Sequence, residues 1–250
     1  MKKIIVLLLL LVAGRVFADE AALQFEQANQ LYRGGEYQKA VSMYEQIISN
    51  GYGNAEVYFN LGNSYFKLKN IPSAILNYER AKRIAPHDED ISYNLRLANI
   101  RIVDKIDPLP TLFLIEWWRA FLNLNSADVW ALISIVALWC LMLSAAAFLL
   151  VRSFLIRRLM TVIGFLAFII GIISFVGVVQ RNQIELSDRE AIVFSQSISV
   201  KSAPDAQSVD LFVIHEGVKT EILDIVGNWR KIRLADGKIG WISSESLQII

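Results

Sequence analysis

Residues 55–88 read AEVYFNLGNSYFKLKNIPSAILNYERAKRIAPHD, and this stretch decides the fold of the first part of the chain. Sliding the sequence against itself gives one clear period of 34 residues. The period relates Ala28, Ala40 and Tyr44 to Gly62, Ala74 and Tyr78. A fixed offset of this length is typical of stacked helical pairs, in which each pair buries its apolar face only against its neighbours. We therefore predict a helical-repeat array.

The same stretch resembles the tetratricopeptide repeat (TPR) at every position of that family's signature. The matching residues are Tyr58, Leu61, Gly62, Tyr65, Ala74, Tyr78, Ala81 and Pro86. Small residues at 62 and 74 allow two antiparallel helices to approach closely, and the tyrosines fill the space around them. The resemblance implies an α-helical solenoid that binds extended peptides or partner helices in its concave groove.

Residues 21–54 form a weaker first copy, in which Gly34 and Gly35 make the turn between the two helices. Residues 89–105 retain only one helix, which we interpret as the cap that covers the last apolar face of the stack. The predicted TPR domain therefore covers residues 19–107, with repeats over 21–54 and 55–88.

The groove of this domain is expected to be lined by equivalent positions of the first helix of each repeat and of the cap. The predicted partner-binding residues are Phe25, Asn29, Arg33, Phe59, Asn63, Lys67 and Arg101. The asparagines stand where TPR domains that bind a carboxylate have theirs, so an acidic or C-terminal tail would fit this groove, although the pattern is incomplete. The alternative is that the charges are merely a solvated surface.

Residues 1–18 predict a secretory signal peptide, because Lys2 and Lys3 precede an apolar run over 4–13 and the small residues Val16 and Ala18 suit cleavage. The run is too short to span a bilayer. An uncleaved anchor is the alternative, since Arg15 lies close to the expected cleavage site. Both interpretations export the residues that follow.

Two apolar stretches, residues 130–151 and 159–179, contain no charged residue and are long enough to cross a bilayer. The loop between them, residues 152–158, is rich in arginine and contains no acidic residue, which indicates a cytoplasmic loop by the positive-inside rule. We therefore predict a two-pass protein of a bacterial inner membrane, with the soluble parts on either side of this hairpin in the periplasm. The uncharged spans argue against transport.

The linker over residues 108–129 is predicted to contain a helix that lies in the membrane interface. Its apolar stretch carries Trp117 and Trp118 together with Glu116 and Arg119. Tryptophan favours the headgroup level of a bilayer, and the two charges oppose spanning.

Residues 188–250 change to short alternations of apolar residues separated by turns at Gly217, Asn228 and Gly237. This pattern predicts a small all-β barrel. Together with residues 240–242, which read Gly-Trp-Ile, these turns resemble a bacterial SH3 domain.

The peptide-binding positions of this SH3-like domain differ from those of eukaryotic SH3 domains. Ser243 and Ser246 replace the proline and tyrosine that line the polyproline groove, so the resemblance does not imply binding of proline-rich peptides. Trp229 and Trp241 are the predicted ligand-contacting residues of the SH3 surface, with packing in the core as the alternative.

No pattern in the sequence predicts catalysis. His87 and His215 lie at turns without an evident catalytic partner, and Cys140 is the only cysteine. The charge is balanced at 25 basic and 24 acidic residues, which excludes a general attraction to nucleic acid. We expect no enzyme activity, no cofactor, no metal site and no nucleic-acid partner.

The order of signal peptide, TPR repeats, two membrane spans and bacterial SH3 domain resembles BatE of the Bacteroides aerotolerance (Bat) family over the entire chain. This resemblance implies a membrane complex with other Bat-type proteins, some of which carry von Willebrand A domains, and a role in tolerance of oxygen or envelope stress. The expected function is that of a non-catalytic scaffold that contacts envelope proteins and membrane lipid. The alternative is a peptidoglycan-binding module that regulates wall metabolism.

Overall fold

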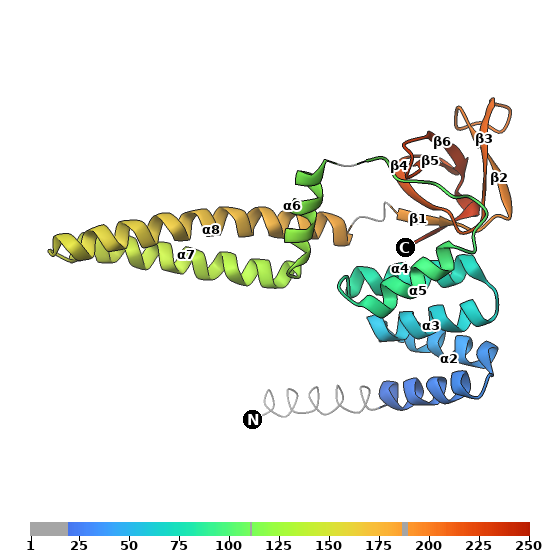
Figure 1. Ribbon diagram of the computed structural model, residues 1–250, viewed down its shortest axis with the longest axis horizontal. Coiled ribbons are helices and arrows are strands. Elements are labelled where there is room, and N and C mark those ends of the chain that lie inside the picture. The colour runs from blue at the N-terminus through green and yellow to red at the C-terminus, as the bar shows by residue number, and fades with distance from the viewer. Residues whose placement is uncertain (1–19, 111, 187–189) are drawn as a thin grey trace, which may run out of the picture. The chain divides into compact units, whose positions relative to one another are not determined.

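The computed structural model describes residues 20–110, 112–186 and 190–250 (Figure 1). The predicted signal peptide, residues 1–18, lies outside the described residues. The chain divides into two compact units: one combines the residues up to Leu109 with those of the C-terminal β domain, and the other begins at Pro110 and contains two long apolar helices. Each unit is described by itself.

Within residues 20–110, five helices form the first part of the combined unit. They are the helix over residues 20–33, α2 (Tyr37–Ser49), α3 (Ala55–Lys67), α4 (Ile71–Ile84) and α5 (Glu89–Asn99). Side-chain oxygens of Asn54, Asn70 and Asp88 accept hydrogen bonds from backbone N–H groups in the first turns of α3, α4 and α5. Such N-caps explain where these helices begin.

Close packing within the second repeat requires glycine at position 62. A Cβ atom added to Gly62 would lie 2.7 Å from the ring of Tyr78, whose side chain is buried. The predicted helix-on-helix approach at this position is therefore confirmed. The N-terminal repeat has its own apolar core, made of Ala28, Ala40, Val41, Tyr44, Ile47, Val57 and Leu61.

The capping helix is shorter than predicted. Helix α5 ends at Asn99 instead of continuing to residue 105. The ammonium group of Lys105 donates hydrogen bonds to the carbonyl oxygens of Asn99, Ile100 and Ile102. Such bonds satisfy carbonyl groups at the C-terminal end of a helix, where they lack a partner within the helix. The chain beyond this point no longer continues as a helix.

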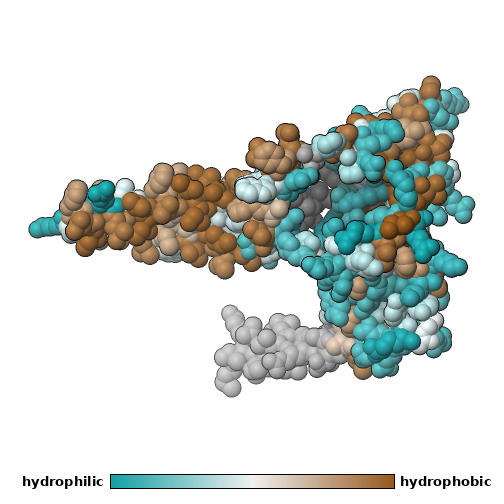
Figure 2. Space-filling model, in the orientation of Figure 1, coloured by the Kyte–Doolittle hydropathy of each residue, from teal (hydrophilic) through white to brown (hydrophobic). Residues whose placement is uncertain are grey.

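The second unit contains α6 (Phe113–Asn123), α7 (Ala127–Leu150) and α8 (Phe154–Leu186). Helices α7 and α8 pack against each other through small residues, with Gly164 opposite Ser144 and Gly171 opposite Ala137. Both are long and apolar enough to cross a membrane by length and composition. Most of their large apolar side chains are exposed, and apolar residues cover most of their visible face (Figure 2).

The β domain is a seven-stranded antiparallel sheet within the described residues. Its strands are β1 (Glu190–Val193), β2 (Ser197–Lys201), β3 (Asp210–His215), β4 (Lys219–Val226), β5 (Trp229–Arg233), β6 (Ile239–Ser243) and β7 (Leu247–Ile249). Their order is β3-β2-β6-β5-β4-β1-β7, so β3 and β7 are edge strands. The predicted SH3-like β fold is confirmed, but the sheet is open where a closed barrel was expected.

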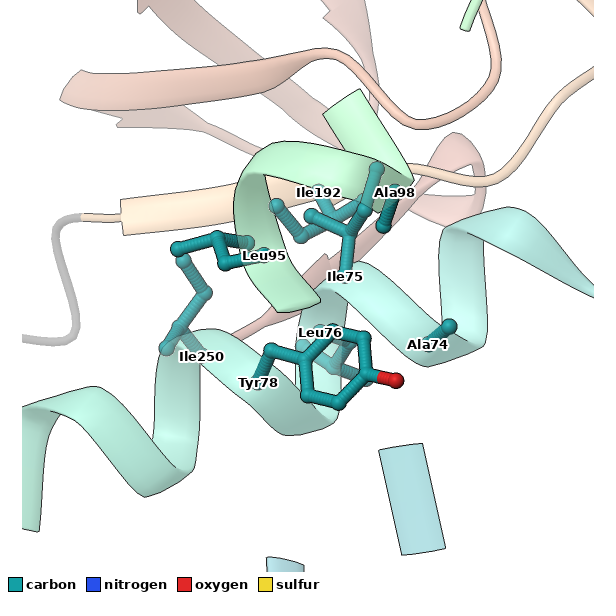
Figure 3. Close-up of a cluster of buried hydrophobic side chains, with 8 residues drawn as sticks. All are labelled: Ala74, Ile75, Leu76, Tyr78, Leu95, Ala98, Ile192 and Ile250. Carbon is teal, nitrogen blue, oxygen red and sulfur yellow. The ribbon is translucent and has the colours of Figure 1, made fainter. Parts of the chain in front are cut away.

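The helical repeats and the β domain share one hydrophobic core. Ile192 of β1 and Ile250 lie in the same buried cluster as Ile75 of α4 and Leu95 of α5 (Figure 3). The cluster also contains Ala74, Leu76, Tyr78 and Ala98. The last helices of the repeat array are therefore covered by the β domain.

Candidate partner-binding site

The predicted groove asparagines form a hydrogen-bonded ladder between helices. Asn29 Oδ1 accepts hydrogen bonds from the Tyr44 hydroxyl at 2.6 Å and from Asn60 Nδ2 at 3.1 Å. One repeat later, Asn63 Oδ1 accepts from the Tyr78 hydroxyl and from Asn94 Nδ2, both at 2.8 Å. An amide oxygen has two lone pairs, so each ladder oxygen is fully used. The ladder holds the first helices of neighbouring repeats in register.

The predicted groove phenylalanines also belong to this framework. The ring centroid of Phe25 lies 6.0 Å from that of Tyr44, and the rings of Phe59 and Tyr78 have the same separation. Both phenylalanines are half-buried. They stabilise the repeats and keep part of each ring on the surface. Phe25 also lines a pocket of about 490 Å³ at the N-terminal end of the array, together with Tyr52 and Val57.

The three predicted basic residues are exposed. Arg33, Lys67 and Arg101 lie at or just beyond the C-terminal ends of the 20–33 helix, α3 and α5, which are the first helices of the two repeats and the cap. Arg33 forms an ion pair with Glu26 at 2.5 Å, and this pairing lowers the pKa of the Glu26 carboxyl group. Cations at these ends also offset the helix dipoles. The exposed part of the predicted groove is therefore a basic edge.

The two amide donors of the asparagine ladder were not predicted from the sequence. Asn60 and Asn94 are separated by the same 34 residues as the other repeat positions. That offset was the signal that could have identified them. They were overlooked because they do not belong to the TPR signature.

The structure brings the two predicted tryptophans of the β domain onto one face of the sheet. Trp229 pairs with Ser243, and Lys231 pairs with Trp241, on the adjacent strands β5 and β6. Because side chains alternate along a strand, these residues share a face, whereas Ile232 points to the opposite, buried side. The ammonium group of Lys231 lies 5.9 Å from the Trp241 ring centroid.

Both tryptophans are half-buried, and neither belongs to the buried cluster of the β domain. As diagonal neighbours on adjacent strands, they lie within reach of one ligand. Part of each ring therefore lies on the surface of the sheet. The alternative prediction had placed the rings in the core.

Residues 25–89 match the tetratricopeptide repeat family model. Residues 197–248 match the model of the bacterial SH3 domain. The two matches confirm the domain content that the repeat period and the turn pattern predicted. No curated protein matches the chain. The likeness of the whole chain to BatE stays a prediction.

A cluster of charged groups joins the TPR domain to the SH3 domain. Lys219 Nζ of β4 lies 2.9 Å from Glu79 of α4 and 3.0 Å from Glu190 of β1. Burial lowers the pKa of Lys219, but the two carboxylates raise it more, so the net pKa lies above its ordinary value. The guanidinium groups of Arg80 and Arg83 donate hydrogen bonds to the backbone carbonyls of residues 249 and 250, each at 2.9 Å.

Residues 102–109, which we call the strap, run from the TPR cap along the SH3 domain. A Cβ atom added to Gly217 would lie 2.4 Å from Ile102, so the strap and this turn are in close contact. Ile106 packs against the buried cluster of the SH3 domain, and the backbone N–H of Leu109 donates to the carbonyl of Ala235 at 3.1 Å. The SH3 core thus includes a residue from outside the predicted 188–250 domain.

Proposed function

We propose that this protein is a non-catalytic, membrane-anchored scaffold whose TPR and SH3 domains bind protein partners. The shared core carries the proposal, because Ile75 of the TPR domain and Ile192 of the SH3 domain lie in one buried cluster. Two recognition domains that are packed together present their surfaces in a fixed relation. Such an arrangement suits the alignment of two partners, or of two segments of one partner.

Helices α7 and α8 are the proposed anchor in the bacterial inner membrane. Their exposed apolar surfaces suit a lipid environment. The predicted loop over residues 152–158 is shorter in the structure, because α8 begins at Phe154. Its arginines, Arg152 in the turn and Arg157 and Arg158 at the start of α8, suit the cytoplasmic side. The shared core also supports an even number of crossings, since residues that precede and follow the hairpin pack together. Both recognition domains would then lie in the periplasm, as they would after export by the signal peptide.

The proposed setting is a Bat-type envelope complex that supports tolerance of oxygen or stress. This part of the proposal rests only on the resemblance of the chain to BatE, in which a TPR domain, two apolar helices and an SH3 domain follow in the same order. Its partners would be other membrane proteins, including those with von Willebrand A domains.

Crosslinking in intact cells, followed by purification of the full-length protein from membranes, tests the scaffold proposal. The wild-type chain should recover a defined envelope protein, and the triple charge reversal R33E/K67E/R101E should reduce its recovery. The matched control is K39E, because Lys39 is also exposed but lies on α2, outside the basic edge. Equal recovery with both variants would remove the groove from the proposal, and recovery of no envelope protein would remove the scaffold.

The second candidate function is recognition of peptidoglycan by the SH3 domain. The observation that favours it is the half-buried pair of Trp229 and Trp241 on one face of the sheet. Full-length protein in lipid nanodiscs should then sediment with purified sacculi, and W241A should reduce the sedimented fraction several-fold. The whole chain is required because Ile106 completes the SH3 core. A sedimented fraction no greater than that of empty nanodiscs would exclude this function.

A further inference from the structure

One face of helix α6 is fixed to the apolar hairpin. Trp118 Nε1 donates a hydrogen bond to Gln180 Oε1 at 2.8 Å, and Trp130 Nε1 donates to the carbonyl oxygen of Leu122 at 3.1 Å. The ring of Phe121 lies between these tryptophans, with centroid distances of 5.5 Å to Trp118 and 5.2 Å to Trp130. These contacts hold α6 across one end of α7 and α8 (Figure 1).

The first turns of α6 carry large apolar side chains that the hairpin does not cover. Phe113, Leu114 and Trp117 are 71%, 62% and 79% exposed. Their spacing places them on one side of a helix. Glu116 and Arg119 are exposed on the opposite side of the helix. The apolar surface of α6 is therefore larger than the part that packs on the hairpin.

The position of α6 along the hairpin matches the edge of the apolar spans. Asn123 at the end of α6 accepts a hydrogen bond from Arg181 at 2.9 Å, and Asp128 lies in the first turn of α7. Beyond this level, residues 130–151 and residues 159–179 carry no charge. Arginines follow at the other end of the hairpin. At about 1.5 Å per residue, an uncharged stretch of this length equals the roughly 30 Å hydrocarbon core of a bilayer.

We propose that Phe113, Leu114 and Trp117 insert into the boundary between the headgroups and acyl chains of the lipid bilayer, while Glu116 and Arg119 face water. The occupant is lipid because the apolar face continues the exposed apolar surface of the hairpin at the level where charged residues begin. Tryptophan is favoured at this depth, and amphipathic helices bury their apolar face there. This inference rests on the proposed anchoring by α7 and α8.

Spin labels on two faces of α6 test the inference. The full chain carries C140A together with either L114C or R119C and is reconstituted in vesicles of phosphatidylethanolamine and phosphatidylglycerol. Power-saturation spectroscopy then compares collisions with oxygen, which enriches in lipid, and with a water-soluble nickel chelate. The ratio of oxygen to nickel collisions should be several-fold higher at position 114 than at 119. Equal, water-like ratios at both positions would overturn the inference.

The native Cys140 provides the control for anchoring. It is exposed in the central part of α7, so a label on the unmodified chain reports whether this helix lies in the hydrocarbon core. A lipid-like label at 140 with a water-like label at 114 removes the inference and keeps the anchor. A water-like label at 140 removes both. A label at 114 that is shielded from oxygen and nickel alike indicates a protein contact, such as a second copy, and also overturns the lipid assignment.

A measurement without labels covers the case in which the cysteine variants fail to fold. Lipids brominated near the headgroup should quench part of the tryptophan emission of the wild-type chain. W117F should lose that part, because Trp117 is the most exposed tryptophan of α6. Unchanged quenching in W117F would contradict the insertion of this side chain.

Discussion

The backbone N–H of His215 donates a hydrogen bond to Asp104 Oδ2 at 2.7 Å, and the imidazole Nδ1 of the same residue lies 3.1 Å from Asp104 Oδ1. Asp104 belongs to the strap, and His215 ends strand β3. One carboxylate thus joins the chain that leaves the TPR domain to an edge strand of the SH3 domain, across 111 residues of sequence.

Replacement of Asp104 by alanine should loosen the strap. A partly buried backbone N–H would lose its acceptor, which costs about 1–3 kcal/mol. Hydrogen–deuterium exchange should therefore become faster in residues 102–109 and in β3, with little change in the helix over 20–33. The matched control is D107A, because Asp107 is exposed in the same strap. Equal exchange in the two variants would contradict a fixing role for Asp104.

Replacement of Lys219 by methionine should weaken the contact between the TPR and SH3 domains at neutral pH. Glu79 is only 13% exposed and would lose its cationic partner. Exchange of the amides in β1 should become several-fold faster. The control is K238M, since Lys238 is 62% exposed and pairs locally with Asp236.

The same lysine predicts a pH dependence. Because the pKa of Lys219 is raised in the folded chain, its stabilising contribution is complete below the ordinary value of 10.5 and is lost as the pH rises through the higher folded pKa. Wild-type exchange in β1 should accelerate at alkaline pH beyond the intrinsic rate increase, and K219M should lack this additional step. An additional step of the same size in K219M would show that another group is responsible.

Replacement of Asn63 by alanine should destabilise the TPR domain more than replacement of Lys67. The hydroxyl of Tyr78 and the amide of Asn94 would both lose their acceptor, at a cost of about 2 kcal/mol. K67A removes only an exposed charge from the last turn of α3. Thermal unfolding of the TPR helices in detergent, followed by circular dichroism, measures both effects. Equal loss of stability would mean that the ladder does not hold the repeats together.

Four of the eight tyrosines should ionise late in an alkaline titration. Burial raises the pKa of Tyr32, Tyr44, Tyr65 and Tyr78 above the ordinary value of 10.0. Their neutral forms therefore stabilise the fold fully below pH 10, and this contribution is lost as the pH rises through the raised pKa values. Absorbance at about 295 nm should show two waves, the later one accompanied by loss of helix. A single wave near pH 10 with intact helices would contradict this packing.

Local and periodic features of the fold could be predicted from the sequence. The 34-residue offset identified the TPR domain, because Gly62 and Tyr78 must meet wherever two such helices cross. Turn residues such as Gly237 identified the SH3-like domain, since they adopt a backbone conformation with positive φ that favours glycine. The residues that give these patterns lie close together in the sequence, and the patterns recur along the chain.

The contacts between domains could not be predicted in this way. Asp104 and His215, or Glu79 and Lys219, are far apart in the sequence and follow no period. Their pairing depends on how the folded TPR and SH3 domains pack against each other. The asparagine ladder is different, because it does follow the 34-residue period. The groove prediction did not include the hydrogen bonds that Asn29 and Asn63 accept from the neighbouring helix, and contact of the groove residues with a partner stays a prediction.

The placement of Ile106 in the SH3 core has a consequence for biosynthesis. Ile106 precedes the hairpin in the chain, whereas the rest of the SH3 core follows it. If α7 and α8 span a bilayer as we propose, this core can form only when both flanks of the hairpin emerge in the same compartment. A chain in which one helix failed to insert would hold the two parts of this core on opposite sides of the bilayer. Folding of the SH3 core would thus depend on correct insertion of the hairpin. Chains that insert incorrectly would remain unfolded in this region and accessible to envelope proteases.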